Sequence, residues 1–140
     1  FEARRDGYRK ALEERGISES PELVVHAENT EDDGQRAVAR LLEQGIQIDA
    51  VFAVSDMLAI GAIQALHEGG CRVPDDVGVV GFDDLPRAAF VTPPLTTVRQ
   101  DIRKSGEGLV EAIVDLIEGR DVESRQTAPA LIVRESCGAR

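Results

Sequence analysis

The sequence is poor in the residues from which disulfides, metal sites and aromatic surfaces are built. It has no tryptophan, two histidines and only 4% aromatic residues, and its two cysteines, Cys71 and Cys137, lie far apart without a CxxC motif. These spacings give no disulfide framework and no zinc site, and they suit a reducing compartment such as the cytoplasm. We therefore expect no bound metal and no cofactor.

Long hydrophobic stretches are also missing. No apolar run approaches the roughly 20 residues that a membrane-spanning helix requires, so we expect no membrane partner. The 42% of hydrophobic and 30% of charged residues are typical of a globular domain. The length of 140 residues fits about one domain. Because the chain opens with Phe1 and not with methionine, we expect it to be a piece of a longer protein.

Positive charge is scarce. Sixteen lysines and arginines stand against 26 aspartates and glutamates, so the formal net charge is −10. A field of this sign repels phosphate backbones, and we expect no direct binding of nucleic acid by this chain. The repulsion does not exclude DNA binding by a segment outside the chain.

Motifs for catalysis and nucleotide binding are missing as well. Gly78 and Gly81 do not form GxGxxG, and there is no GxxxxGK[ST] sequence. No Ser/His/Asp set or paired-carboxylate arrangement suggests a reaction. We expect the chain not to be an enzyme.

The chain does contain a regular alternation of helical and extended patterns. Strands that alternate with helices indicate βαβ units, so we predict an α/β fold with a mainly parallel sheet and helices on both faces. Thr30 and Ser55 stand where they can cap the helices that follow them. The predicted helices cover residues 4–15, 31–44, 56–67, 85–91 and 103–118. The predicted strands cover residues 23–27, 48–54, 77–82, 95–100 and 130–134.

Polar side chains follow three of the predicted strands. Asp83 and Asp84 follow one strand, Ser55 a second and Asn29 a third. The carboxyl ends of parallel strands meet at one edge of a sheet, where α/β proteins bind their ligands. We therefore predict a ligand site at this edge.

Each of these residues has a structural alternative. Aspartate and serine are good helix N-caps, and a helix is predicted after both Asp83 and Ser55. One cap needs only one carboxylate, so we favour Asp83 as a ligand contact and Asp84 as its structural partner. Ser55 stays open between cap and ligand contact. Arg4 stands at a helix start, where the helix dipole disfavours cations, which hints at a role beyond solvation.

Five segments together resemble the lac repressor/galactose repressor family of bacterial transcription regulators. They occur in the family's order and with its spacing, and they cover nearly the whole chain. The run from Val73 to Gln100 is the most specific of the matches. The segments are RRDGYRKAL (4–12), AVFAVSDMLAIGAIQAL (50–66), GCRVPDDVGVVGFDDL (70–85), TPPLTTVRQ (92–100) and LIVRES (131–136).

The resemblance implies a DNA-binding headpiece followed by a two-lobed sensor that is similar to a periplasmic sugar-binding protein. Residues 1–98 would form an incomplete C-terminal lobe, whose first helix and strand lie upstream. Residues 99–130 would cross over and pack on the N-terminal lobe, and residues 131–140 would return to the C-terminal lobe.

The family's effector contacts match five residues of this chain. Arg4 matches an arginine that binds effector hydroxyls or carboxylates, and Asp83 matches a strand-end aspartate that accepts hydrogen bonds from the effector. Gln100 matches a cleft residue at the crossing between the lobes. Ser55 stands where asparagine is common, and Asn29 stands where an aromatic ring often stacks on the ligand.

The family also dimerises side by side. For this interface the resemblance suggests Met57, Phe90 and Val91, and the alternative is that these residues pack within the chain's own core.

Together these features predict a cytoplasmic, homodimeric transcriptional regulator that acts as a repressor. It would bind a small effector, a sugar or a related metabolite, and it would reach operator DNA through a headpiece absent from this chain. The alternative is a periplasmic solute-binding protein of a sugar transporter, which shares the fold. A signal peptide upstream would favour the transporter, and an upstream helix-turn-helix would favour the regulator.

Overall fold

The computed structural model describes residues 2–124 and 126–139. Helices and strands alternate along the chain, as the sequence predicts. The α-helices are α1 (Glu2–Glu13), α2 (Glu31–Glu43), α3 (Asp56–Glu68) and α4 (Ile102–Ile117). The strands are β1 (Ala50–Phe52), β2 (Gly78–Phe82), β3 (Thr96–Arg99) and β4 (Ala130–Ile132). Short 3-10 helices are η1 (Pro21–Leu23), η2 (Pro86–Ala89) and η3 (Glu135–Cys137).

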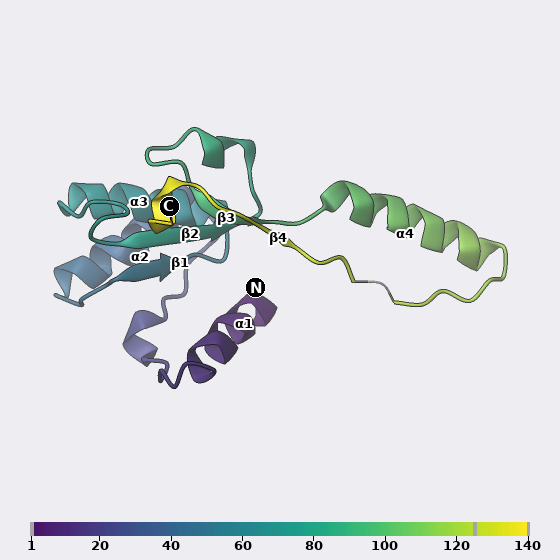
Figure 1. Cartoon of the computed structure of the whole chain (residues 1–140), viewed down its shortest axis with the longest axis horizontal. Coiled ribbons are helices and arrows are strands. Elements are labelled where there is room, and N and C mark those ends of the chain that lie inside the picture. Colours follow the sequence, from purple (N-terminus) through teal and green to yellow (C-terminus); the bar gives the residue numbers. More distant parts are fainter. Residues whose placement is uncertain (1, 125, 140) are drawn as a thin grey trace.

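The strands form one sheet in the order β1-β2-β3-β4. β1 pairs with β2, and β2 with β3, in parallel, with Val51 opposite Val79 and Val80 opposite Thr96. β4 pairs with β3 in the antiparallel direction, because the chain leaves the sheet along β3, forms α4 and comes back from the same end (Figure 1). The mainly parallel sheet is confirmed, and its antiparallel last pair is a feature that the alternation of helices and strands does not predict.

One face of the sheet is covered by α3, which packs in turn against α2. Val79 of β2 points to this face and is fully buried, and a methyl group built on Gly81 would touch Ala59 of α3. Since α3 is enclosed between the sheet and α2, it needs apolar residues on most of its circumference. Its buried apolar residues are Ala59, Ile60, Ala62, Ile63, Ala65 and Leu66.

The two helices α2 and α3 touch backbone to backbone where they cross. A methyl group built on Gly61 of α3 would lie 1.9 Å from the carbonyl oxygen of Glu31, and one built on Gly34 of α2 would lie 2.3 Å from that of Leu58. Such an approach is open only to a residue without a side chain. The two glycines therefore set the distance between the helices.

Both predicted helix caps are confirmed. The Thr30 hydroxyl accepts a hydrogen bond from the Asp33 amide at 3.1 Å, and the Ser55 hydroxyl accepts one from the Leu58 amide at 3.3 Å. Each cap satisfies a donor that the first turn of a helix leaves without an internal partner. The first of these helices begins at Glu31 and the second at Asp56.

The opposite face of the sheet carries α1. Phe52 of β1 and Phe82 of β2 alternate with the residues that face α3, so they point to this side. Tyr8 stacks on Phe52 with ring centroids 6.1 Å apart, and the Arg4 guanidinium lies 3.7 Å from the centroid of the Phe82 ring. A pocket of about 560 Å³ lies between α1 and the strands, and Ala3, Gly7, Ala11 and Val98 complete its lining. Helices on both faces are thus confirmed, although this second face is thinly covered.

The predicted strand 23–27 is wrong. Pro21–Leu23 is a 3-10 turn, and residues 24–28 run on without joining the sheet. Strands exist through their ladder of hydrogen bonds, and the described sheet ends at β1, whose partner is β2. Val25 accordingly keeps 40% of its surface exposed. The apolar run has the composition of a strand but has no neighbour to pair with.

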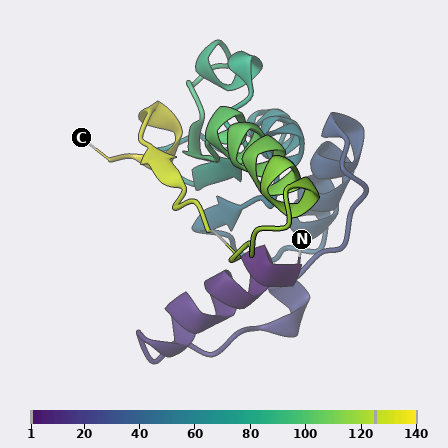
Figure 2. The same ribbon diagram turned by 90° about the vertical axis from the view of Figure 1, so that its right-hand side faces the viewer.

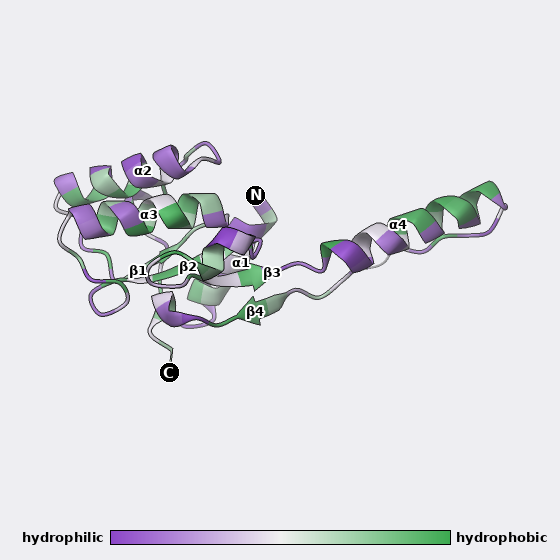
Figure 3. Cartoon of the chain, turned by 90° about the horizontal axis from the view of Figure 1, so that it is seen from above, coloured by the Kyte–Doolittle hydropathy of each residue, from purple (hydrophilic) through white to green (hydrophobic). Residues whose placement is uncertain are grey.

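Helix α4 stands apart from the rest of the molecule. It projects from the end of the sheet (Figures 1 and 3), so that it lies in front of the sheet in the view of Figure 2, and none of its residues is buried. Apart from Ile102 at its start, its apolar side chains lie exposed along the outer half of the helix, which is the strongly hydrophobic stretch in Figure 3. The exposed apolar residues of α4 are Ile102, Leu109, Val110, Ile113, Val114, Leu116 and Ile117.

Candidate functional site

The loop after β2 has an unusual backbone. Asp83 and Asp84 both adopt positive φ angles, of 117° and 52°. Three consecutive amides hold the loop in this conformation. The Asp83 amide donates to the Val98 carbonyl oxygen at 2.9 Å, and the Asp84 amide donates to Thr97 Oγ1 at 3.3 Å. The Leu85 amide donates to Asp56 Oδ2 at 2.7 Å. The two carboxylates therefore leave the end of β2 in fixed and different directions.

Asp83 points to a cluster of polar side chains at the carboxyl ends of the strands. Arg4 Nη2 of α1 donates to Asp83 Oδ1 at 3.1 Å, and Gln100 Nε2 donates to the same oxygen at 3.4 Å. Arg4 also donates to the carbonyl oxygen of Val54, beyond β1, while its guanidinium covers the Phe82 ring. Three of the five residues predicted for the effector site thus meet at one carboxylate.

The other two predicted residues form a separate pair. Ser55 donates to Asn29 Oδ1 at 2.5 Å. The Ser55 hydroxyl also caps α3, and its residue is only 1% exposed, so the capping alternative describes its position. Asn29 is exposed and offers its amide group to solvent. Of this pair, Asn29 is the residue that a ligand can reach.

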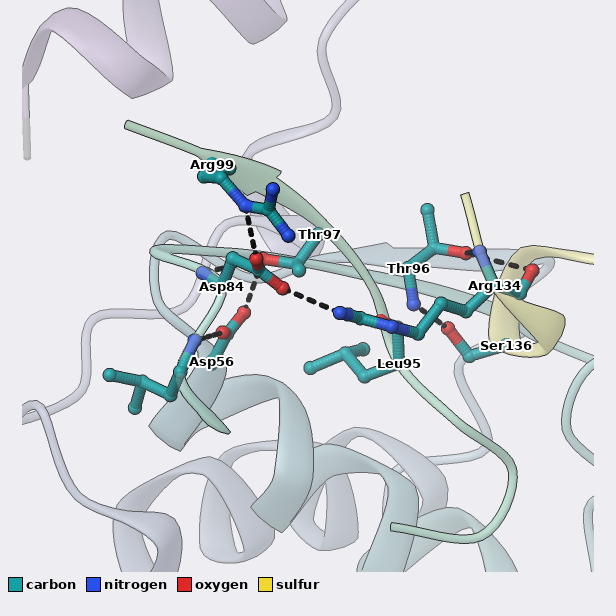
Figure 4. A network of polar contacts seen from close by, with 9 residues as sticks. Asp56, Asp84, Leu95, Thr96, Thr97, Arg99, Arg134 and Ser136 are labelled. Atoms are coloured by element: carbon teal, nitrogen blue, oxygen red, sulfur yellow. Dashed lines mark hydrogen bonds and ion pairs between the residues drawn. The ribbon is translucent and has the colours of Figure 1, made fainter. Parts of the chain in front are cut away.

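Asp84 turns away from this cluster and joins the end of β3, where the chain leaves for α4, to the segment that follows the returning strand β4 (Figure 4). Its Oδ2 accepts from Arg99 Nε at 2.5 Å, at the end of β3, and its Oδ1 accepts from Arg134 Nη2 at 2.7 Å, just past β4. Arg134 also donates to the Leu95 carbonyl oxygen at 2.7 Å. Burial of the Asp84 carboxyl opposes its ionisation, but the hydrogen bonds from Arg134 and Arg99 outweigh it and lower its pKa. Asp84 is a structural partner, as the sequence suggests.

The lowered pKa of Asp84 has a consequence at acid pH. Above the unfolded-state pKa of about 3.9 the ionised carboxylate stabilises the fold, and this contribution disappears as the pH falls through the lower folded-state pKa. Breaking a buried ion pair costs about 3–5 kcal/mol, but Arg99 is half exposed. We expect Asp84→Asn to lower the free energy of unfolding by about 2 kcal/mol at pH 7 and by less at pH 3.

Urea unfolding at the two pH values measures this difference. Asp75→Asn is the matched control, because the Asp75 side chain is 67% exposed on the turn before β2. A wild-type protein and an Asp84→Asn variant whose stabilities fall in parallel with pH would contradict the assignment.

Asp56 is a site residue that the sequence alone does not single out. Its carboxylate is fully buried at the first turn of α3, where Oδ1 accepts from Thr97 Oγ1 at 2.5 Å and Oδ2 accepts from the Leu85 amide. It thereby ties α3 to β3 and to the loop after β2. In the sequence, Asp56 is recognisable only as an aspartate that directly follows a helix-capping serine. Its structural role becomes clear only from the fold, which places Thr97 beside it.

A second buried polar contact fixes the C-terminal segment to the sheet. Ser136 is fully buried, and its hydroxyl accepts from the Thr96 amide at 2.8 Å and donates to the Val79 carbonyl oxygen at 2.6 Å. Thr96 Oγ1 and the backbone of Arg134 also exchange two hydrogen bonds, of 2.8 and 3.0 Å. Ser136 of η3 is thus hydrogen-bonded to both β2 and β3, and Figure 4 shows its bond to Thr96 of β3.

The residues suggested for dimerisation differ in exposure. Met57 is half-buried at the start of α3, and Val91 packs against the core, as the alternative of intramolecular packing requires. Phe90, in contrast, keeps 84% of its surface exposed after η2. It is the apolar residue of the three that a partner could cover.

Within residues 2–124 and 126–139, no group of three or more His, Cys, Asp or Glu side chains is placed to hold a metal ion. Within the same ranges, no helix combines the length and the apolarity needed to cross a lipid bilayer.

Comparison with known proteins places this geometry in a family. The periplasmic binding protein-like domain family matches residues 1–137. The transcriptional repressor PurR of Haemophilus influenzae (strain PittEE) is 36% identical over 138 residues, which cover 95% of this chain and 41% of that protein. The transcriptional regulator CelR of Thermobifida fusca is 38% identical over 135 residues, which cover 95% and 40%. The chain spans about two fifths of the length of these relatives.

Solved structures give the same result. A complex of the regulator CelR with cellobiose has a TM-score of 0.87 and 38% identity, over 95% of this chain and 41% of that one. The lac repressor dimer bound to operator and the anti-inducer ONPF has a TM-score of 0.88 and 30% identity, over 97% and 47%. The chain belongs to the periplasmic binding protein-like domain family, in the form carried by LacI-family transcriptional regulators.

Proposed function

We propose that this chain is part of the sensor domain of a ligand-responsive transcriptional repressor, and that it binds a small effector at Asp83. The convergence of Arg4 and Gln100 on the Asp83 carboxylate, at the carboxyl ends of the strands, carries the proposal. The regulator would be a cytoplasmic homodimer without enzymatic activity. It would bind operator DNA through a headpiece outside this chain, which is consistent with the chain's own net charge of −10.

The chemistry of the cluster suits an effector with hydroxyl groups. A carboxylate accepts several hydrogen bonds, and charged partners strengthen each of them. The side chains of Arg4 and Asp83 are 22% and 28% exposed, so the pair is supported by the fold and remains open to a ligand. Asn29 is hydrogen-bonded to Ser55, the neighbour of Val54, to which Arg4 donates, and it would add an amide that can donate and accept. A sugar or a related metabolite presents the hydroxyl donors that this cluster can take.

The proposed division of the chain explains the exposed surfaces of the fold. Residues 1–98 belong to the C-terminal lobe, residues 99–130 cross to the N-terminal lobe, and residues 131–140 return. The apolar side of α4 then packs on the N-terminal lobe, because an uncovered stripe of this size is unusual on a soluble protein. An upstream strand beside β1 would likewise cover the open edge of the sheet and part of the pocket under α1.

Phe90 is the centre of the proposed dimer contact. An aromatic side chain that is 84% exposed buries a large apolar area when a partner covers it, and aromatic residues dominate the energetics of interfaces. Met57 and Val91 would lie at the edge of this contact, with part of each side chain already packed inside the lobe.

Effector binding would act by favouring one arrangement of the two lobes. The headpieces of the dimer would then change their spacing, and with it their affinity for the operator. A ligand shifts this equilibrium only by its difference in affinity for the two arrangements.

The role of Asp83 can be tested by thermal shift in the intact regulator. The panel comprises cellobiose, maltose, glucose, glucose 6-phosphate and hypoxanthine. A ligand held at about 100 times its dissociation constant stabilises the protein by roughly 2.7 kcal/mol. We expect at least one compound to raise the melting temperature and the effect to disappear in Asp83→Ala, because the variant lacks the acceptor of the effector hydroxyls.

Asp75→Ala is the control, since it removes an exposed aspartate from the turn before β2. It should keep the shift. A shift that survives Asp83→Ala would move the site elsewhere, and a panel without any shift would count against a sugar or purine effector.

A further inference from the structure

We propose that Asp84 is a positioning residue that holds Asp83 in its ligand-binding conformation and ties it to the end of β3 and to the segment that follows β4. The inference rests on the proposed function of Asp83. Asp84 itself touches no ligand in this scheme, because its carboxylate faces Arg99 and Arg134 and not the cluster around Arg4. The two adjacent aspartates thus divide recognition and support between them.

Asp83 and Asp84 share an unusual stretch of backbone, because both have positive φ angles. One rigid peptide plane joins them, so the direction of one side chain depends on that of the other. An aspartate is only tolerated in this region of φ, so outside contacts must hold it there. The amides of Asp83 and Asp84 supply two such contacts, to Val98 and Thr97 of β3.

Two arginines from different segments hold the Asp84 carboxylate. Arg99 ends β3, from which the chain leaves toward α4, and Arg134 follows β4, along which the chain returns. One carboxylate with 8% of its surface exposed therefore bridges both segments, as Figure 4 shows. Arg134 is 19% exposed and Arg99 54%, so the bond to Arg134 is less screened by water.

The contacts of Asp84 are connected to the ligand site through the end of β3. Gln100, which reaches Asp83 Oδ1, is the next residue after Arg99. The outgoing segment is thus attached to both aspartates, to Asp83 by Gln100 and to Asp84 by Arg99. A ligand that moves Asp83 would act through Asp84 on the end of β3, where the chain leaves for α4, and on the segment after β4. That is a physical link between the site and residues 99–130, which are proposed to cross to the N-terminal lobe.

The stacking of Arg4 on Phe82 offers a readout that needs no ligand. An aromatic ring shifts the NMR signals of groups above its face to higher field, and Arg4 lies 3.7 Å from the Phe82 centroid while bound to Asp83. The native-state chemical shift of the Arg4 side chain therefore reports the position of Asp83. Global stability alone does not move it. The experiment uses the intact regulator with isotope-labelled arginine, and Arg4→Lys assigns the signal.

We expect the high-field shift of Arg4 to fall by at least half in Asp84→Asn. Arg134→Gln should give nearly the same loss and Arg99→Gln a smaller one, in line with their exposure. Asp115→Asn is the matched control, because it breaks an ion pair with Arg120 beyond the sheet and should leave the shift unchanged.

The outcomes separate this inference from the proposed function. An Arg4 signal that is unchanged in Asp84→Asn, or that is not shifted in the wild-type protein, would overturn the positioning role, whatever the ligand panel shows. If the high-field shift of Arg4 falls as expected but no compound of the ligand panel raises the melting temperature, Asp84 is still a positioning residue. A sugar or purine is then not the ligand of Asp83. If Asp84→Asn does not fold, the two arginine variants decide the same question.

Discussion

Gly61→Ala is expected to lower the free energy of unfolding by about 3 kcal/mol or more, the upper end of what overpacking costs. The new methyl group would lie 1.9 Å from the carbonyl oxygen of Glu31 and 2.7 Å from the amide nitrogen of Gln35. Both atoms belong to the backbone of α2, so no side-chain rotation relieves the clash, and α2 must move away from α3. Alanine gains about 1 kcal/mol over glycine in helix propensity, which is too little to compensate.

Gly108→Ala is a matched control for this substitution. Gly108 also lies inside a helix, α4, and a methyl group built there meets nothing within 4 Å. It shares a face of α4 with Lys104, Glu111 and Asp115, away from the apolar side that is proposed to pack on the N-terminal lobe. This variant should therefore keep or slightly raise stability through the same propensity. Chemical denaturation of the intact regulator measures both variants. If Gly61→Ala proved as well tolerated as Gly108→Ala, the close crossing of α2 and α3 would be incorrect.

Ser136→Ala is expected to destabilise the protein by about 3 kcal/mol, although it removes a single oxygen atom. The Ser136 hydroxyl satisfies the Thr96 amide and the Val79 carbonyl oxygen in a fully buried place. A buried donor or acceptor left without a partner costs about 1–3 kcal/mol, and here one change strands one of each. The apolar methyl group of alanine offers neither of them a replacement.

Ser105→Ala serves as the control, because Ser105 is exposed on α4. Its free energy of unfolding should stay within about 0.5 kcal/mol of the wild-type value. Thermal and urea unfolding give both numbers. A loss below about 1 kcal/mol for Ser136→Ala would mean that water or a shifted backbone replaces the hydroxyl, and that the C-terminal segment contributes little to the sheet.

The elements that follow from local chemistry could be predicted closely. Capping and apolar periodicity act within a few residues, so they predict a helix at 56–67, and α3 runs from Asp56 to Glu68. The run 23–27 shows the limit of such signals, because a strand depends on a partner strand that the local sequence does not contain. The reversed direction of β4 depends on the path of the chain through α4, and no local pattern contains it.

The same distinction holds in the site. The position of Asp83 at a strand end points to a ligand role, and the family resemblance adds Arg4 and Gln100, which the structure brings to the same carboxylate. The partners of Asp84 lie 15 and 50 residues away, and those of Ser136 lie 40 and 57 residues away. Contacts over such separations arise from the fold, so no spacing in the sequence announces them.

The positive φ of Asp83 means that the residue which is best for folding stability at this position is not the residue that is proposed to bind the effector. An aspartate held at 117° carries a conformational penalty of about 1–3 kcal/mol that glycine would escape. A screen of random variants that rewards thermostability alone would therefore tend to enrich Asp83→Gly, and each such winner would have discarded the carboxylate on which Arg4 and Gln100 converge. Protein engineers who stabilise sensors of this type should thus treat the strand-end aspartate as a fixed position and seek their gains elsewhere in the lobe.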